Sequence, residues 1–196
     1  MAVLSADQQS VDLKDQAIDL GYAPKEGFWS AKFIPAKPGL YMVAHSLDTL
    51  HRTTRAIKSG KTFFLVSDSL DKVAVPANSF DQPVGNNLEL VPSNTLVAPM
   101  GPGKPISVCL MYQGKPLPKA RVTFIPRGTV LTEGFDENYE RMTDAEGLAT
   151  FTPTEGNYVL VVAHHAEPEQ RGEGYDRTSY SATLTVYVPE LCTCCE

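Results

Sequence analysis

The chain has 196 residues, of which 42% are hydrophobic and 20% charged, and its net charge is −6. This length allows one or two folded domains, and the composition is that of a globular protein rather than a disordered one. The negative charge and the lack of a basic stripe argue against a nucleic-acid surface. No apolar run approaches the roughly 20 residues that cross a membrane. We therefore expect no nucleic-acid partner and no membrane span.

Alternating apolar residues and frequent turn residues predict an all-β chain. The 15 prolines and 14 glycines are spread along the sequence, which suits short strands joined by turns. In the first half, residues 40–44 and 61–67 are predicted strands, and residues 7–20 carry a weak helical pattern that a strand would also fit. In the second half, alternation predicts strands at 106–111, 120–124, 158–165 and 179–188.

Two similar segments suggest an internal repeat. Residues 33–45 read FIPAKPGLYMVAH, and residues 151–165 read FTPTEGNYVLVVAHH. Each has Phe-x-Pro, then Gly-x-Tyr, an apolar run and Ala-His. The second segment is apolar on both faces, which predicts a central strand with packing on each side. We interpret the pair as two β-rich units in tandem, and chance similarity of two Gly-x-Tyr strands is the alternative.

The predicted fold is therefore all-β, with two tandem immunoglobulin-like or prealbumin-like β-sandwich units and at most one short helix in the first half. The turn cluster PMGPGKP at 99–105 and the loop-rich stretch before residue 88 separate the halves. We expect an N-terminal β-rich domain at 1–87, a β-sandwich at 88–190 and a Cys-rich tail at 191–196.

Four histidines are the candidate metal ligands of the folded part: His45, His51, His164 and His165. Neutral imidazole binds nickel, cobalt, copper or zinc, and carboxylates complete such sites. The two adjacent histidines point to opposite faces of a strand, so His164 is expected to combine with a carboxylate such as Glu167 or Glu169. His45 and His51 can meet if the polar segment between them folds back as a loop. The alternative for each ring is a structural role, bonded to backbone at a strand end.

The four cysteines are unevenly placed. Cys109 stands alone, whereas Cys192, Cys194 and Cys195 crowd the end of the chain. A disulfide between Cys109 and one tail cysteine, or a bridge between molecules, fits an oxidising compartment. The alternative is a thiolate site for a soft metal ion at the tail.

A family resemblance adds to this interpretation. The segments GKPLPKARVTF (114–124), TDAEGLATF (143–151) and GNYVLVVA (156–163) resemble a carboxypeptidase-regulatory-like, or transthyretin-like, β-sandwich. Together with LELVP (88–92) they are similar to the DUF4198 family, which includes NikM-type periplasmic proteins associated with nickel and cobalt transport. The first half fits more loosely, through PGLYMVAH and KSGKTFFLVS. The family's usual amino-terminal strand and its histidine near the mature start are not evident in this sequence.

The resemblance implies an extracytoplasmic, non-enzymatic protein that captures or delivers a transition-metal ion of the nickel or cobalt class. Its partners would be the ion, with nickel, cobalt, copper or zinc as candidates, and a component of an envelope transporter. A periplasmic or extracellular location is expected, with a signal peptide lying outside this numbering. No catalytic motif is evident. The alternatives are a structural cell-surface or filament-forming subunit that self-assembles through edge strands and tail cysteines, and an accessory subunit of an enzyme.

Overall fold

The structure is a computed structural model that describes residues 1–7, 9–21, 28–69, 80–97 and 100–190. These residues form β-strands, turns and a single 3₁₀ turn at Lys14–Gln16. The expectation of an all-β protein is therefore confirmed. The helix considered for residues 7–20 is wrong, because this stretch contains β2, the 3₁₀ turn and β3, and its apolar residues do not share one buried face.

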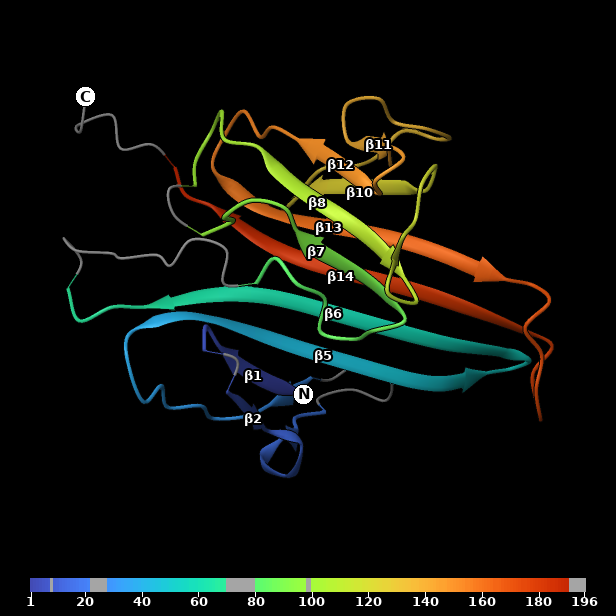
Figure 1. Cartoon of the computed structure of the whole chain (residues 1–196), viewed down its shortest axis with the longest axis horizontal. Coiled ribbons are helices and arrows are strands. Elements are labelled where there is room, and N and C mark those ends of the chain that lie inside the picture. The colour runs from blue at the N-terminus through green and yellow to red at the C-terminus, as the bar shows by residue number, and fades with distance from the viewer. Residues whose placement is uncertain (8, 22–27, 70–79, 98–99, 191–196) are drawn as a thin grey trace.

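An eight-stranded sheet runs through the molecule (Figure 1). Its strands, in spatial order, are β11 (Glu140–Met142), β10 (Arg121–Pro126), β13 (Asn157–Glu167), β14 (Arg177–Val188), β6 (Thr54–Val66), β5 (Gly39–His51), β1 (Ala2–Ser5) and β2 (Ser10–Asp12). A smaller sheet contains β12 (Leu148–Phe151), β8 (Ile106–Tyr112) and β7 (Leu88–Pro92), with β9 (Lys115–Pro116) paired to β8. A third sheet consists of two short strands, β3 (Ile18–Asp19) and β4 (Trp29–Ser30).

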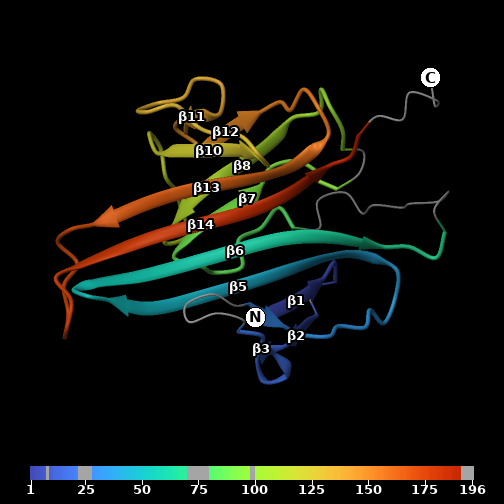
Figure 2. The ribbon, with the colours of Figure 1, turned by 180° about the vertical axis from the view of Figure 1, so that it is seen from behind.

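The smaller sheet covers one face of the large one and forms a sandwich. Figure 1 shows β7, β8 and β12 in front of the large sheet, and the view from behind in Figure 2 shows the large sheet nearest. Alternate residues of the strands fill the space between the sheets because successive side chains point to opposite faces. Val159 and Val161 of β13 and Leu184 of β14 face Val108 and Leu110 of β8, and all five are fully buried.

Two long hairpins place the repeated segments in one sheet. β5 pairs antiparallel with β6, β13 pairs antiparallel with β14, and β14 pairs in parallel with β6 over residues 177–185 and 54–62. The predicted boundary at residue 87 falls between β6 and β7, so strands from both sides of it share the large sheet. The division of the chain into two units remains a prediction.

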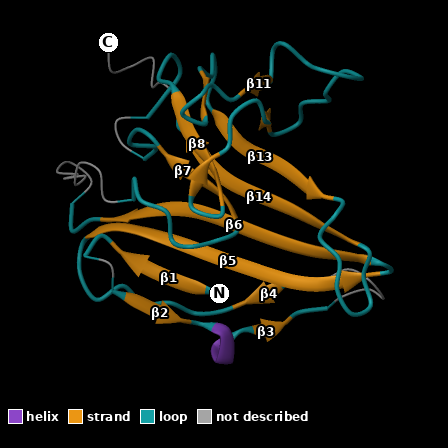
Figure 3. Cartoon of the chain, turned by 45° about the vertical axis from the view of Figure 1, so that its right-hand side comes forward, coloured by secondary structure: helices purple, strands orange, loops and turns teal. Residues whose placement is uncertain are grey.

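The short β3–β4 sheet and the residues around it form an amino-terminal layer beside β1 and β5 (Figure 3). Val3 of β1 and Leu13 pack on Tyr41 of β5, and the Tyr41 ring stacks on Phe64 at 5.3 Å. The amino-terminal strand that was not evident in the sequence is therefore present as β1, paired with β5. Sequence analysis missed it because residues 2–5 are too few to show a period.

One further expectation was wrong. The outer face of β13 is open rather than packed, with Tyr158 50% and Leu160 38% exposed, because the amino-terminal layer covers β5 and not β13. The turn before β11 carries buried acidic side chains. Asp136 and Glu140 are buried, and their carboxylates accept backbone N–H groups of Thr132, Asn138 and Asp136. These bonds replace the water that each carboxylate loses.

Candidate functional site

His45 and His164 lie on the same outer face of the large sheet but in different strands. His45 pairs with Gly60 of β6, and His164 pairs with Ser181 of β14. Since β13 and β5 are three strand spacings apart, the two side chains are separated by about 14 Å across the sheet. One metal ion cannot bridge that distance, so the shared position of these histidines in the repeat does not create a shared site.

His45 and His51 lie in one continuous strand, β5. The predicted loop that folds back between them is wrong, because the polar segment forms the end of the β5–β6 hairpin. Six residues of extended chain hold the two Cα atoms about 20 Å apart. Burial, and then the charge of the amino terminus, lower the pKa of His45, so this imidazole is neutral at pH 7.

His165 has a carboxylate partner. Its Nε2 lies 2.9 Å from Oε1 of Glu167. Residues 165 and 167 share a face of β13 because the side-chain period of a strand is two, whereas His164 points to the other face. The expected pairing of Glu167 with His164 is therefore wrong. The side chains of His165 and Glu167 are 25% and 36% exposed, which leaves the pair accessible from solvent.

Two tyrosines complete a cluster around this pair. The ring of Tyr112, from β8 in the opposite sheet, lies 4.4 Å from the His165 ring and 5.2 Å from the Tyr180 ring. The Tyr180 hydroxyl donates to Oε1 of Gln170 at 2.6 Å. Burial, then hydrogen bonding to Tyr180 and later Glu167, raises the pKa of Tyr112. We call Tyr112, His165, Glu167 and Tyr180 the tyrosine–histidine cluster.

Sequence analysis missed the tyrosines of this cluster. The alternation of β8 places Tyr112 on the same face as Ile106, Val108 and Leu110, and that of β14 places Tyr180 on the core face. This signal is sufficient to predict that both rings face inward. It cannot show that they meet His165, since that contact depends on how the two sheets stack.

The cysteines are only partly described. Cys109 has no disulfide partner among the described residues. It is a half-buried thiol on the side of β8 that faces away from the core, and its Sγ donates to the Glu146 carbonyl. Burial, and then the charge of Asp144, raise the pKa of this thiol, which disfavours the reactive thiolate. Cys192, Cys194 and Cys195 lie outside the described residues, so the predicted disulfide and the predicted thiolate site remain predictions.

The buried pair of Lys61 and Glu89 has a structural role. Their side chains are 3% and 1% exposed, and the ammonium donates to the carboxylate. Glu89 also accepts the backbone N–H groups of Val84, Gly85 and Asn86. The pair therefore ties the segment before β7 to the large sheet, and its donors and acceptors are already used.

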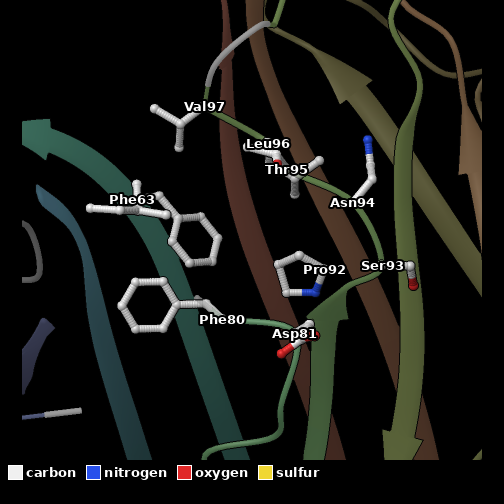
Figure 4. Close-up of a pocket in the computed structure, with 10 residues that line it drawn as sticks. Phe63, Phe80, Asp81, Pro92, Ser93, Asn94, Thr95, Leu96 and Val97 are labelled. Carbon is white, nitrogen blue, oxygen red and sulfur yellow. The ribbon is translucent and has the colours of Figure 1, made fainter. Parts of the chain in front are cut away.

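An apolar pocket lies near the end of β7 (Figure 4). Phe63 and Phe80 face Pro92, Leu96 and Val97 across it. Its volume is about 30 Å³, which is room for about one water molecule and not for an organic substrate. We assign it to packing between the large sheet and the chain after β7.

Within the described ranges, no group of three or more His, Cys, Asp or Glu side chains is placed to hold a metal ion. The tyrosine–histidine cluster contributes one histidine and one carboxylate, and its other members are phenols. Nor does any helix among the described residues have the length and apolarity to cross a membrane.

The fold and this cluster define an all-β sandwich protein with a partly exposed imidazole–carboxylate pair at the end of one strand. The chain belongs to the DUF4198 family, a domain of unknown function, whose model matches residues 2–167. The match runs from β1 to the end of β13 and so crosses the predicted boundary at residue 87. The comparisons with curated proteins and with solved structures returned no match.

Proposed function

We propose that the chain is an extracytoplasmic, non-enzymatic binding protein that captures a transition-metal ion or delivers it to an envelope transporter. The observation that carries the proposal is the 2.9 Å contact between His165 and Glu167 in a partly exposed position. Imidazole and carboxylate are ligands for nickel, cobalt, copper and zinc. The resemblance to NikM-type proteins points to nickel or cobalt within that class.

A rigid scaffold supports this role. His165 is held between Tyr112 of one sheet and Tyr180 of the other, so the orientation of its ring is fixed before any ion arrives. A preorganised ligand loses little conformational freedom on binding, which raises affinity. The Nε2 atom points toward Glu167 at the open end of β13, where solvent can reach it.

Equilibrium dialysis of the metal-free full chain against nickel, cobalt, copper and zinc tests the proposal. We expect one ion per chain with a Kd below about 10 µM, which corresponds to roughly 7 kcal/mol of binding free energy. The variant His165→Ala should lose this binding, and His51→Ala, at the exposed tip of β5, should retain it. If all four ions bind more weakly than that limit, the proposal fails.

A second candidate is a structural subunit that self-assembles. It is favoured by large apolar side chains exposed in the amino-terminal layer, where Ile18 is 63%, Trp29 66% and Ile34 73% exposed. Large apolar side chains that are exposed in the monomer can be buried at an interface between molecules. Sedimentation velocity tests it: assembly that is abolished by Trp29→Ser supports it, and a monomer at all concentrations removes it.

A further inference from the structure

The outer face of the large sheet carries an exposed pair of tyrosines. Tyr158 of β13 and Tyr187 of β14 are direct cross-strand partners, and their ring centroids lie 4.8 Å apart at an interplanar angle of 39°. The two residues are 50% and 55% exposed, so both rings present a large part of their surface to solvent. Two adjacent exposed rings make a contiguous aromatic surface, which is the kind of surface that marks a binding site.

Arg127 extends this row on the other side of Tyr158. The pairing of β10 with β13 continues one residue beyond β10, since the backbone N–H of Arg127 donates to the Tyr158 carbonyl at 2.8 Å. Directly opposed residues project to the same face, so Arg127, Tyr158 and Tyr187 occupy neighbouring positions on three adjacent strands. We call these three residues the aromatic row. Among the described residues, no carboxylate lies within ion-pair distance of the Arg127 guanidinium, whereas Arg121 has such a partner in Glu140.

The face around the aromatic row is cationic, although the whole chain has a net charge of −6. The outward positions of β10, β14 and β6 include Arg121, Arg177 and Lys58. In the described part of these strands and of β13 and β11, the carboxylate at an outward position is that of Glu140, which is buried and lies 3.6 Å from Arg121. Figure 2 shows this face of β10, β13, β14 and β6 on the near side. Charge therefore favours an anionic ligand here.

The chemistry of the row fits a sugar that carries a carboxylate. The C–H face of a pyranose ring is apolar and packs against an aromatic ring, and a carboxylate accepts paired N–H groups from a guanidinium. The row lies on an open sheet rather than in an enclosed pocket, which suits one ring within a longer chain of sugars more than a small ligand that must be surrounded. Nucleic acid offers bases and phosphates to the same residues, but its dense negative charge is repelled by a protein of net charge −6.

We propose that the aromatic row binds an acidic polysaccharide through one of its uronic-acid residues. The rings of Tyr158 and Tyr187 pack against the sugar, and Arg127 pairs with the sugar carboxylate. This inference goes beyond the proposed function, because Tyr158 and His165 project from opposite faces of β13 and the two sites share no residue.

Isothermal titration calorimetry of the full chain tests the inference with four probes: the tetramers of galacturonate and of mannuronate, and the methyl ester of each. We expect wild type to bind at least one acid tetramer with a Kd below about 1 mM. The corresponding ester keeps the sugar rings and removes their charge, so it should bind at least about tenfold more weakly. Added salt should weaken binding of the acid and leave that of the ester unchanged.

Variants of exposed residues assign this binding to the row. Tyr158→Ala and Arg127→Gln should each lower the affinity about tenfold, through loss of ring packing and of the ion pair respectively. Tyr158→Phe keeps the ring and should bind like wild type. Lys104→Gln, which removes an exposed charge in the turn before β8, is the control for charge and should also bind like wild type. Thermal unfolding of each variant confirms that it is folded.

Failure of wild type to bind either acid tetramer overturns the inference, as does equal binding of acid and ester. Undiminished binding by folded Tyr158→Ala or Arg127→Gln also overturns it. Tighter binding of an oligodeoxythymidylate than of both acid tetramers would make the row a nucleic-acid site instead. The metal-binding proposal is tested separately, since His165→Ala should bind the acid tetramer like wild type.

Discussion

At the scale of single residues, Glu89 is a buried carboxylate whose oxygens are fully used by Lys61 and three backbone N–H groups. Burial lowers the pKa of Lys61, and the charge of Glu89 opposes this effect, so the ammonium depends on its partner. Removal of the carboxylate would leave a buried cation and unsatisfied donors.

We predict that Glu89→Ala destabilises the protein by roughly 3–5 kcal/mol, the usual cost of breaking a buried ion pair. Urea unfolding measures the change. Glu155→Ala, which removes an exposed carboxylate, is the control and should change stability by less than about 0.5 kcal/mol. Similar losses in the two variants would show that the buried pair contributes nothing particular to this fold.

Asp136 should make stability depend on pH. Backbone N–H groups of Thr132, and then of Asn138, lower the pKa of Asp136 in the folded protein. A lowered pKa stabilises the fold at pH values above the unfolded pKa, and this contribution is lost as the pH falls through the folded pKa. We predict that, as the pH is lowered from 5, the urea midpoint of wild type falls more steeply than that of Asp136→Asn. Parallel curves for the two proteins would contradict this role.

At the scale of elements, the turn before β12 requires a glycine. Gly147 has φ = 75°, and a Cβ atom there would lie 2.7 Å from the Leu110 carbonyl oxygen. Gly134 also has a positive φ of 86°, but a Cβ atom at that position would meet no other atom within 4 Å. Comparing substitutions at the two positions therefore separates the cost of backbone strain from the cost of a steric clash.

We predict that Gly134→Ala costs about 1 kcal/mol, from the left-handed backbone alone, and that Gly147→Ala costs clearly more. Thermal unfolding of both variants gives the comparison. An equal cost at the two positions would mean that the Leu110 strand moves away without penalty.

The same elements show what sequence can predict. The strands with clear alternation, such as 106–111 and 179–188, are close to β8 and β14, because one of their faces is buried in the sandwich. A loop was considered between His45 and His51, but this segment forms part of the β5–β6 hairpin. Its polar residues gave no signal, since exposed strand ends have no apolar period. The site was also predicted only in part. His165 was selected from the sequence, but its contact with Tyr112 depends on how the two sheets stack.

At the scale of the whole molecule, the parallel pairing of β14 with β6 joins the two halves of the chain. Leu184 of β14 is fully buried in the core that the large sheet shares with β8. If the shared sheet makes folding cooperative, a loss of packing in the second half of the chain must also destabilise the first half.

We predict that Leu184→Ala lowers the unfolding free energy by about 2–5 kcal/mol. The opening free energy obtained from amide exchange should fall by the same amount in the β5–β6 hairpin and in the β13–β14 hairpin. Hydrogen exchange followed by mass spectrometry measures both hairpins in one experiment. A loss confined to β13–β14 would instead support two independent units divided near residue 87.

His165 is the ligand on which the proposed metal-binding function depends. The most direct test is the metal content of the full chain at equilibrium, measured for wild type, His165→Ala and His51→Ala with nickel, cobalt, copper and zinc in turn. We predict one bound ion per chain in wild type and His51→Ala, and none in His165→Ala. Equal binding in all three proteins, or binding in none, would contradict it.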